Sequence, residues 1–237
     1  MRALGAILSV ACLAGCVTRQ AAPPAPARAP SGRPVPSPQL GRPFDIVAAR
    51  SRLIVLVYRT GPLAAFGHDH VIACRCLAGT VHLPRDPLRA SFDVRIPVER
   101  LTVDTPTLRA AQHSADFPPA VPQPDREGTR RHMLGAAQLN AAVHPDITLR
   151  SEGLRASPDG RPGDVVVEVA VRVAGQSRSI TVPMHYDIRG EEIVVTGAFP
   201  LEQTDLAMTP YSIMGGALRV SNGMRVRIRL VARRSGP

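Results

Sequence analysis

Every second residue from Val165 to Val173 is valine, and this alternation limits the folds that the chain can adopt. The residues between the valines include Glu168 and Arg172. Successive side chains of a β-strand point to opposite faces, so the segment predicts a strand with one buried and one solvated face. The same period-two pattern occurs in further segments at residues 92–98, 180–186, 193–199 and 225–230. The sequence therefore predicts an all-β, antiparallel domain.

Turn-forming residues stand between these segments. Ala174-Gly175-Gln176 and Arg189-Gly190-Glu191 suit short hairpin loops, and Ser157-Pro158-Asp159-Gly160 suits another turn. The strands between about residues 165 and 199 are therefore expected to form a β-meander. One segment differs, because Leu53–Tyr58 is apolar at every position and predicts a strand covered on both faces.

Residues 104–146 interrupt the pattern and show no clear strand. We expect one or two helical turns at 107–113, a loop at 118–128, and a short helix from a Thr129 cap to about Leu139. About eight antiparallel strands must protect the edges of their sheet, either by closing into a barrel or by forming a two-sheet sandwich. The helical insertion favours a single barrel with a capped mouth, and the sandwich is the alternative.

The N-terminus predicts export. Met1-Arg2 supplies a positive start, and residues 3–14 form an apolar run of about 12 residues, which is too short to span a bilayer. Cys16 follows Leu13-Ala14-Gly15, which resembles the processing signal of a bacterial lipoprotein. That resemblance implies removal of residues 1–15 as a signal peptide and lipidation of Cys16. An ordinary signal peptide with an incidental cysteine is the alternative.

The segment after this cysteine predicts a tether to the membrane. Val17 replaces the aspartate that favours retention in the inner membrane in similar lipoproteins, which points to the outer membrane, facing the periplasm. Residues 16–43 are rich in proline and alanine, a composition that favours extended polyproline II structure over a packed core. We therefore expect a lipid-anchored protein of the bacterial cell envelope whose single folded domain covers residues 44–237.

The chain has a net charge of +10, and all 29 of its lysine-type or arginine-type residues are arginines, since it contains no lysine. The arginines are dispersed along the sequence, aromatic residues make up 3% of it, and tryptophan is absent. Nucleic-acid-binding surfaces concentrate basic residues on one face, often beside stacking aromatic residues, so we expect no nucleic-acid partner. A solvated basic surface is the simplest interpretation, and weak attraction to lipid headgroups or lipopolysaccharide is the alternative.

Cys74 and Cys76 are the cysteines that remain after removal of the signal and lipidation. In an extended strand, residues i and i+2 lie roughly 6–7 Å apart. The Cβ atoms of a disulfide lie about 3.5–4.5 Å apart, so a bridge demands a kink. We therefore expect free, buried thiols, and a strained bridge, a metal site and an intermolecular disulfide are the alternatives.

Several segments together resemble the YceI-like family. They are Asp45 and Ser51 with the strand Leu53–Tyr58, Leu77–Val81 around its glycine, Val103-Asp104 followed by Arg109, Arg131–Leu134, His144–Ser151, Phe199–Leu206 and Gly215–Val220. The resemblance covers about residues 44 to 233 and rests on the order and spacing of all of them. It implies an exported, lipocalin-like antiparallel β-barrel that binds a polyisoprenoid or similar amphiphile in an elongated apolar cavity.

His68-Asp69-His70 is the most concentrated polar cluster of the predicted domain. In an extended backbone His68 and His70 point to the same side, so we take them, with His132 near the barrel mouth, as candidate contacts for a ligand headgroup. With Cys74 and Cys76, the two histidines also make a candidate copper or zinc site, since imidazole and thiolate suit these metals. A structural role for the histidines is the simplest alternative.

No arrangement of residues points to catalysis. The chain lacks a Gly-x-Ser-x-Gly nucleophile elbow, a His-Glu-x-x-His zinc motif and a glycine-rich phosphate loop. We therefore expect a protein that is not an enzyme, with no cofactor other than a bound isoprenoid-type lipid. The favoured function is binding of a polyisoprenoid, quinone or similar amphiphilic lipid inside the barrel, for sequestration or transport. The alternatives are a periplasmic metal-binding protein and a structural or interaction module whose barrel is packed solid.

Overall fold

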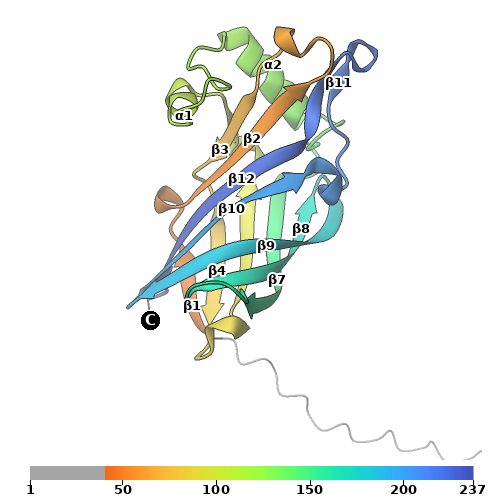
Figure 1. The fold of residues 1–237 in the computed structure, drawn as a ribbon. Helices are drawn as coiled ribbons and strands as arrows, with labels where there is room; N and C mark the ends of the chain where they lie inside the picture. Colours follow the sequence, from red (N-terminus) through yellow and green to blue (C-terminus); the bar gives the residue numbers. More distant parts are fainter. Residues whose placement is uncertain (1–40, 237) are drawn as a thin grey trace, which may run out of the picture. The chain divides into compact units, whose positions relative to one another are not determined.

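A computed structural model describes residues 41–236, so the predicted signal peptide, Cys16 and most of the tether lie outside the described residues. The domain consists of antiparallel strands with two short α-helices near one end of the barrel (Figure 1). The strands are β1 (Arg42–Ile46), β2 (Arg52–Thr60), β3 (His70–Cys74), β4 (Ala78–Leu83), β5 (Ser91–Pro97), β6 (Thr102–Val103), β7 (Asp146–Ala156), β8 (Asp164–Val173), β9 (Gln176–Arg189), β10 (Glu192–Glu202), β11 (Ser212–Ile213) and β12 (Leu218–Arg234). The helices are α1 (Pro106–Ala110) and α2 (Gln123–Leu134).

The strands close into one barrel. Neighbouring strands follow the order β1–β4–β5–β7–β8–β9–β10–β12, and β12 pairs with β1, for example through Ala232 opposite Ile46. The pairings around this ring are antiparallel. The prediction of a single antiparallel, lipocalin-like barrel of about eight strands is confirmed, and the two-sheet sandwich is wrong.

Two strands of the barrel wall are broken part-way along their length. The 3-10 helix Ala48–Arg50 separates β1 from β2, and both strands pair with successive parts of the long strand β12. Ser51 is fully buried at this break, where its hydroxyl donates to the Val47 carbonyl (2.9 Å) and accepts from the Val231 amide (3.0 Å). A bend at Arg75 separates β3 from β4 in the same way.

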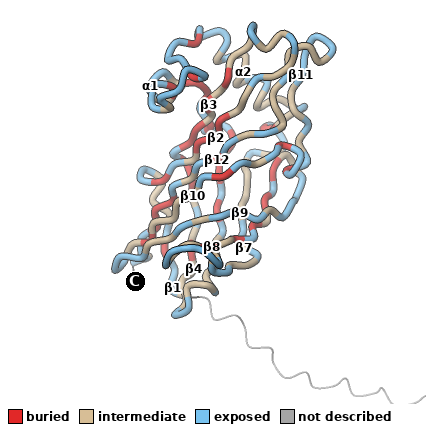
Figure 2. Tube along the Cα trace, viewed as in Figure 1, coloured by how far each residue is buried: buried red, intermediate tan, exposed pale blue. Residues whose placement is uncertain are grey.

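The predicted inward faces line the barrel. The alternating valines of β8 lie in one continuous core with the apolar residues of β5, β9, β10 and β12, while exposed residues lie on the outside (Figure 2). Ala174 and Gly175 join β8 to β9 in a two-residue turn, with φ values of 47° and 79°. Hairpins of two residues favour such positive φ values, because they match the twist of the strands. The predicted meander is confirmed.

Strand β2 is covered on both faces, as its apolar run predicts. Leu53 and Val55 pack against the barrel core, whereas Ile54 and Leu56 belong to a second apolar cluster. Phe117, from the helical insertion, completes that second cluster on the outside of the barrel. The insertion therefore covers part of the barrel wall.

The helical insertion is present, but the predicted limits of its second helix are wrong. The helix α2 begins at Gln123 and ends at Leu134, so Thr129 lies within it and does not cap it. Pro124 stands in the first turn, where the missing N–H of a proline costs nothing, and this explains the earlier start. Gly135 follows the last helical residue. Among residues 41–236, no helix has the length and apolar character needed to cross a membrane.

Cys74 and Cys76 form a disulfide, so the expectation of free thiols is wrong. Strand β3 ends at Cys74 and the chain bends at Arg75, which brings the Cα atoms of the two cysteines to 5.3 Å. An unbroken strand holds such residues about 6–7 Å apart. Both cysteines are buried in the barrel core, at the break between β3 and β4.

Candidate ligand-binding site

The barrel is hollow. One cavity of about 290 Å³, here the mouth cavity, lies next to α2 and β11, and a second of about 240 Å³, the deep cavity, lies among the barrel strands. The two cavities adjoin, because they share the lining residues Leu53, Val55, Ile147, Leu206 and Met224. The alternative of a barrel packed solid with side chains is therefore wrong.

The deep cavity is lined by apolar side chains. They come from β2, β4, β5, β7, β8, β9, β10 and β12, and the valines at 165, 167, 169 and 171 form one wall. Tyr186 is its only lining side chain with a polar atom among the described residues. A small barrel either fills itself with side chains or holds one slender ligand. Valine side chains are short and leave space inside the barrel, whereas aromatic side chains at the same positions would occupy it. This cavity suits an apolar chain.

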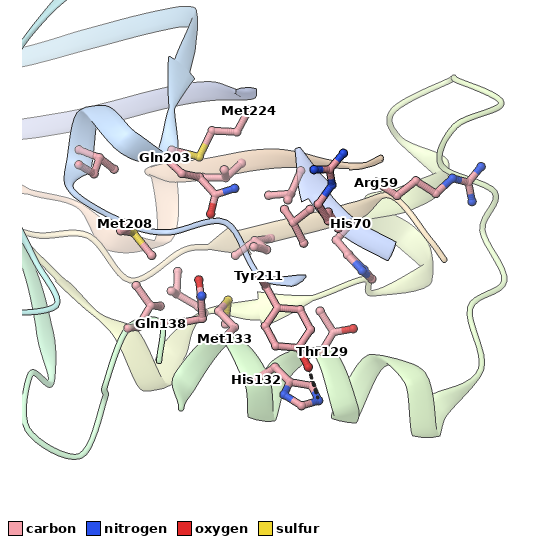
Figure 3. Close-up of a pocket in the computed structure, with 18 of the residues that line it drawn as sticks. Arg59, His70, Thr129, His132, Met133, Gln138, Gln203, Met208, Tyr211 and Met224 are labelled. Atoms are coloured by element: carbon pink, nitrogen blue, oxygen red, sulfur yellow. Dashed lines mark hydrogen bonds between the residues drawn. The ribbon is translucent and has the colours of Figure 1, made fainter. Parts of the chain in front are cut away.

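The mouth cavity adds polar groups to an apolar wall. Figure 3 shows Arg59 and His70 on one side of it, with His132 and Thr129 of α2 on the other. The polar lining residues are Arg59, His68, His70, Thr129, His132, Gln138, Gln203, Tyr211 and Arg219. The two cavities together offer an apolar interior and a polar entrance, which are complementary to the apolar chain and the polar headgroup of an amphiphile.

All three histidines that the sequence singled out line the mouth cavity. His132 packs on Tyr211 with ring centroids 4.8 Å apart, and its Nε2 lies 3.5 Å from the tyrosine hydroxyl. His68 Nε2 lies 3.4 Å from a carboxylate oxygen of Asp125 on α2. The fold thus brings His68 and His70 to the same cavity as His132, although the helix lies far away in the sequence.

A buried carboxylate orients His70. Asp104 is fully buried; it accepts from the Val71 amide (2.8 Å), and its other oxygen lies 2.6 Å from His70 Nδ1. Burial raises the pKa of Asp104, but hydrogen bonds from His70, Val71 and Arg109 outweigh it and hold the pKa below its usual value. The His70 ring is therefore fixed by its Nδ1, and Nε2 has no hydrogen-bond partner among residues 41–236.

Arg109 completes this network and links it to the insertion. Its side chain is buried and donates to Asp104 and to the carbonyls of Asp69 and Pro118, each at 2.6 Å. The guanidinium also lies over the ring of Phe117, 5.7 Å from its centroid. Sequence reasoning missed this network. Its only signal in the sequence is Val103-Asp104 followed by Arg109, a feature of the family resemblance that does not reveal the contact of Asp104 with His70.

Comparison with known proteins identifies the family. Residues 67–232 match the model of the YceI-like domain. The chain belongs to the YceI-like family. No curated protein sequence matches it.

Solved structures show the same YceI-like fold. BcnA of Burkholderia cenocepacia has 15% identity and a TM-score of 0.57, over 79% of this chain and 99% of that one. A polyisoprenoid binding domain from Saccharophagus degradans has 11% identity and a TM-score of 0.53, over 81% of this chain and 98% of that one. At such identities the likeness establishes the fold alone.

The candidate metal ligands do not come together in this YceI-like domain. Cys74 and Cys76 are joined in a disulfide within the barrel core, so neither offers a thiolate. His68 and His70 line the mouth cavity, and His70 already pairs with Asp104. Within residues 41–236, no three His, Cys, Asp or Glu side chains gather as a metal site requires. The predicted copper or zinc cluster is therefore not formed.

Proposed function

We propose that this YceI-like protein binds a polyisoprenoid, quinone or similar amphiphilic lipid inside its barrel, and sequesters or carries it in the bacterial cell envelope. One observation carries the proposal: an apolar deep cavity joins a mouth cavity that has polar groups. The Saccharophagus degradans domain of the same fold is described as polyisoprenoid binding, which supports this ligand class.

In this proposal the two cavities bind different parts of the ligand. The apolar chain of the ligand occupies the deep cavity, where its burial contributes roughly 25 cal/mol per Å² of apolar surface. The headgroup stays in the mouth cavity, within reach of His68, His70 and His132. Binding of this kind needs apolar area and a few polar contacts, so the proposal includes no catalytic residue and no resident cofactor or metal.

The place of the protein in the cell rests on its N-terminal sequence. We propose that residues 1–15 are removed, that Cys16 is lipidated, and that residues 16–43 tether the barrel to the outer membrane on its periplasmic side. Such an anchor would keep a carrier or store of a membrane lipid in the envelope in which its ligand resides.

Native mass spectrometry tests the proposed ligand class. The chain is produced with residues 1–16 replaced by a cleavable export signal, here the unlipidated chain, and purified from the periplasm without detergent. We expect a discrete added mass that organic solvent removes and that fragments as a prenyl lipid. A bare protein mass that persists after incubation with ubiquinone and polyprenyl phosphate contradicts the proposal, and so does an added mass of copper or zinc in place of lipid.

A further inference from the structure

Exposed apolar side chains gather at the mouth of the barrel. Among residues 41–236, five large apolar residues are exposed, and three of them are Phe66, Ile213 and Met214, at 80%, 37% and 70%. They lie on two loops, residues 61–69 between β2 and β3 and residues 207–217 around β11, here called the rim loops. Apolar residues scattered singly on a surface are ordinary, but a group at a cavity mouth marks an interaction surface.

The rim loops form one continuous surface. The Leu63 amide donates to the Ala217 carbonyl at 2.9 Å, so the two loops are joined by a backbone hydrogen bond. Both loops also line the mouth cavity, through Gly67 on one side and Tyr211 and Ile213 on the other. Figure 1 shows the end of β2 and strand β11 at the same end of the barrel. The exposed apolar group therefore lies beside the entrance to the cavity.

The backbone of the second rim loop holds its methionine outward. Met214 has a φ of 52°, and Gly215 and Gly216 follow with φ values of 62° and 93°. A residue other than glycine pays about 1–2 kcal/mol for this left-handed conformation. The side chain of Met214 is nevertheless largely exposed, so it gains no packing inside the domain that offsets this cost.

The charge of this surface favours an anionic partner. The only acidic residue of the two rim loops is Asp69, which is buried, and Arg59 and Arg219 flank the loops. Arg219 lines the mouth cavity and forms no ion pair within residues 41–236. Arg59 pairs with the buried Asp69, with its Nε 3.8 Å from a carboxylate oxygen, and donates to the Gly67 carbonyl of the first rim loop. The nearest acidic group on α2, Asp125, already pairs with His68. The rim is therefore apolar with one uncompensated arginine, Arg219, on a domain of net positive charge, which matches a bilayer that carries anionic headgroups.

We propose that the rim loops dock on a bilayer containing anionic lipid, with Phe66, Ile213 and Met214 inserted among the headgroups and Arg219 facing the lipid charges. An amphiphile then passes between the bilayer and the mouth cavity without crossing water. The transfer step rests on the proposed lipid-binding function, whereas docking is measured without any ligand.

A single tryptophan tests the docking. The chain contains none, so Phe66→Trp in the unlipidated chain supplies a unique fluorescent probe. With vesicles of phosphatidylethanolamine and phosphatidylglycerol we expect its emission to shift to the blue and to be quenched by brominated lipids. Val143→Trp is the matched control, because Val143 is 64% exposed but lies outside the rim loops and does not line the mouth cavity. Its emission is expected to stay unchanged.

Two outcomes overturn the proposal in this assay. One is an emission from the Phe66→Trp protein that vesicles leave unchanged. The other is a blue shift that grows with protein concentration in the absence of vesicles, since that result assigns the rim to a second copy of the chain.

Charge substitution separates docking from ligand binding. We expect Phe66→Asp with Met214→Asp to lower the fraction of protein that floats with vesicles at least ten-fold, while Val143→Asp does not. Native mass spectrometry of the same proteins reports the ligand. Vesicle binding that survives the double substitution contradicts docking and leaves the lipid-binding proposal intact. If no protein carries prenyl lipid but the unaltered chain still floats with vesicles, the lipid-binding proposal is contradicted and docking is not.

Discussion

At the scale of single residues, Asp104 holds the wall of the mouth cavity together. Its carboxylate bonds to His70 on β3, the Val71 amide and Arg109 on α1. Each partner is buried or half-buried, so the loss of the carboxylate leaves a buried guanidinium without its counter-charge. Removal of one partner from a buried ion pair costs about 3–5 kcal/mol.

We expect Asp104→Ala to lower the free energy of unfolding by about 3–5 kcal/mol at neutral pH, measured by urea denaturation. Because the pKa of Asp104 is lowered in the folded protein, its contribution is present above the unfolded pKa of 3.8 and is lost as the pH falls toward the folded value. The difference between the two proteins should therefore shrink below about pH 3.8. A difference that stays constant from pH 5 to pH 3 contradicts this account.

The disulfide makes a smaller contribution, because it closes a very short loop. The chain-entropy relation gives about 1–2 kcal/mol for a bridge between residues i and i+2. We expect Cys74→Ser with Cys76→Ser to lower the free energy of unfolding by that amount and to leave ligand binding unchanged. Alkylation of the unfolded protein without reductant checks the bridge itself, since two labelled thiols would show that it is absent.

At the scale of helices and strands, two glycines make opposite predictions. Gly128 lies inside α2, and an added Cβ there meets only the end of the Arg131 side chain, at 3.9 Å. Gly128→Ala should therefore stabilise the domain by about 0.5–1 kcal/mol. Gly79 in β4 has a φ of 137°, and its Cβ would lie 2.0 Å from the Asp93 carbonyl oxygen. Gly79→Ala should destabilise the domain by about 1–3 kcal/mol.

Thermal or urea unfolding of both variants decides this prediction, and changes of the same sign in the two proteins would contradict it. The glycine of α2 is a matter of helix propensity alone, whereas the glycine of β4 permits the close approach of β5.

The strands of the meander were predictable because each strand carries its own period-two signal. The valines of β8 specify their face locally, and the Ala174-Gly175 turn specifies the hairpin. The breaks at Ala48–Arg50 and Arg75 were not predictable, because they follow from the closure of the barrel against β12 and carry no local signal. The disulfide depends on the second break and was missed with it.

The candidate site was predictable in part for the same reason. His68 and His70 form a visible local cluster, and His132 was placed near the mouth by its helix. The contact of His70 with Asp104 joins residues 34 positions apart in the sequence, so no local pattern reveals it. A buried arginine such as Arg109 is also invisible to a reading that expects charges on the surface.

At the scale of the whole molecule, the hollow barrel follows from its lining. Valine, leucine and isoleucine predominate along the inner faces and leave an apolar space that the side chains do not fill. Val55 lies at the junction of the mouth cavity and the deep cavity. A large side chain at this position closes the passage between them. We therefore expect Val55→Trp to exclude a long-chain ligand from the deep cavity while the barrel stays folded.

Native mass spectra of the unaltered protein and the Val55→Trp protein, prepared in parallel without detergent, test the central claim most directly. Ala198→Trp, on the exposed outer face of β10, is the matched control for a tryptophan in the barrel wall. We predict a prenyl-lipid adduct on the unaltered protein and the Ala198→Trp protein, and its loss from a folded Val55→Trp protein. The same adduct on all three proteins would show that the lipid does not occupy the barrel, and the account would be wrong.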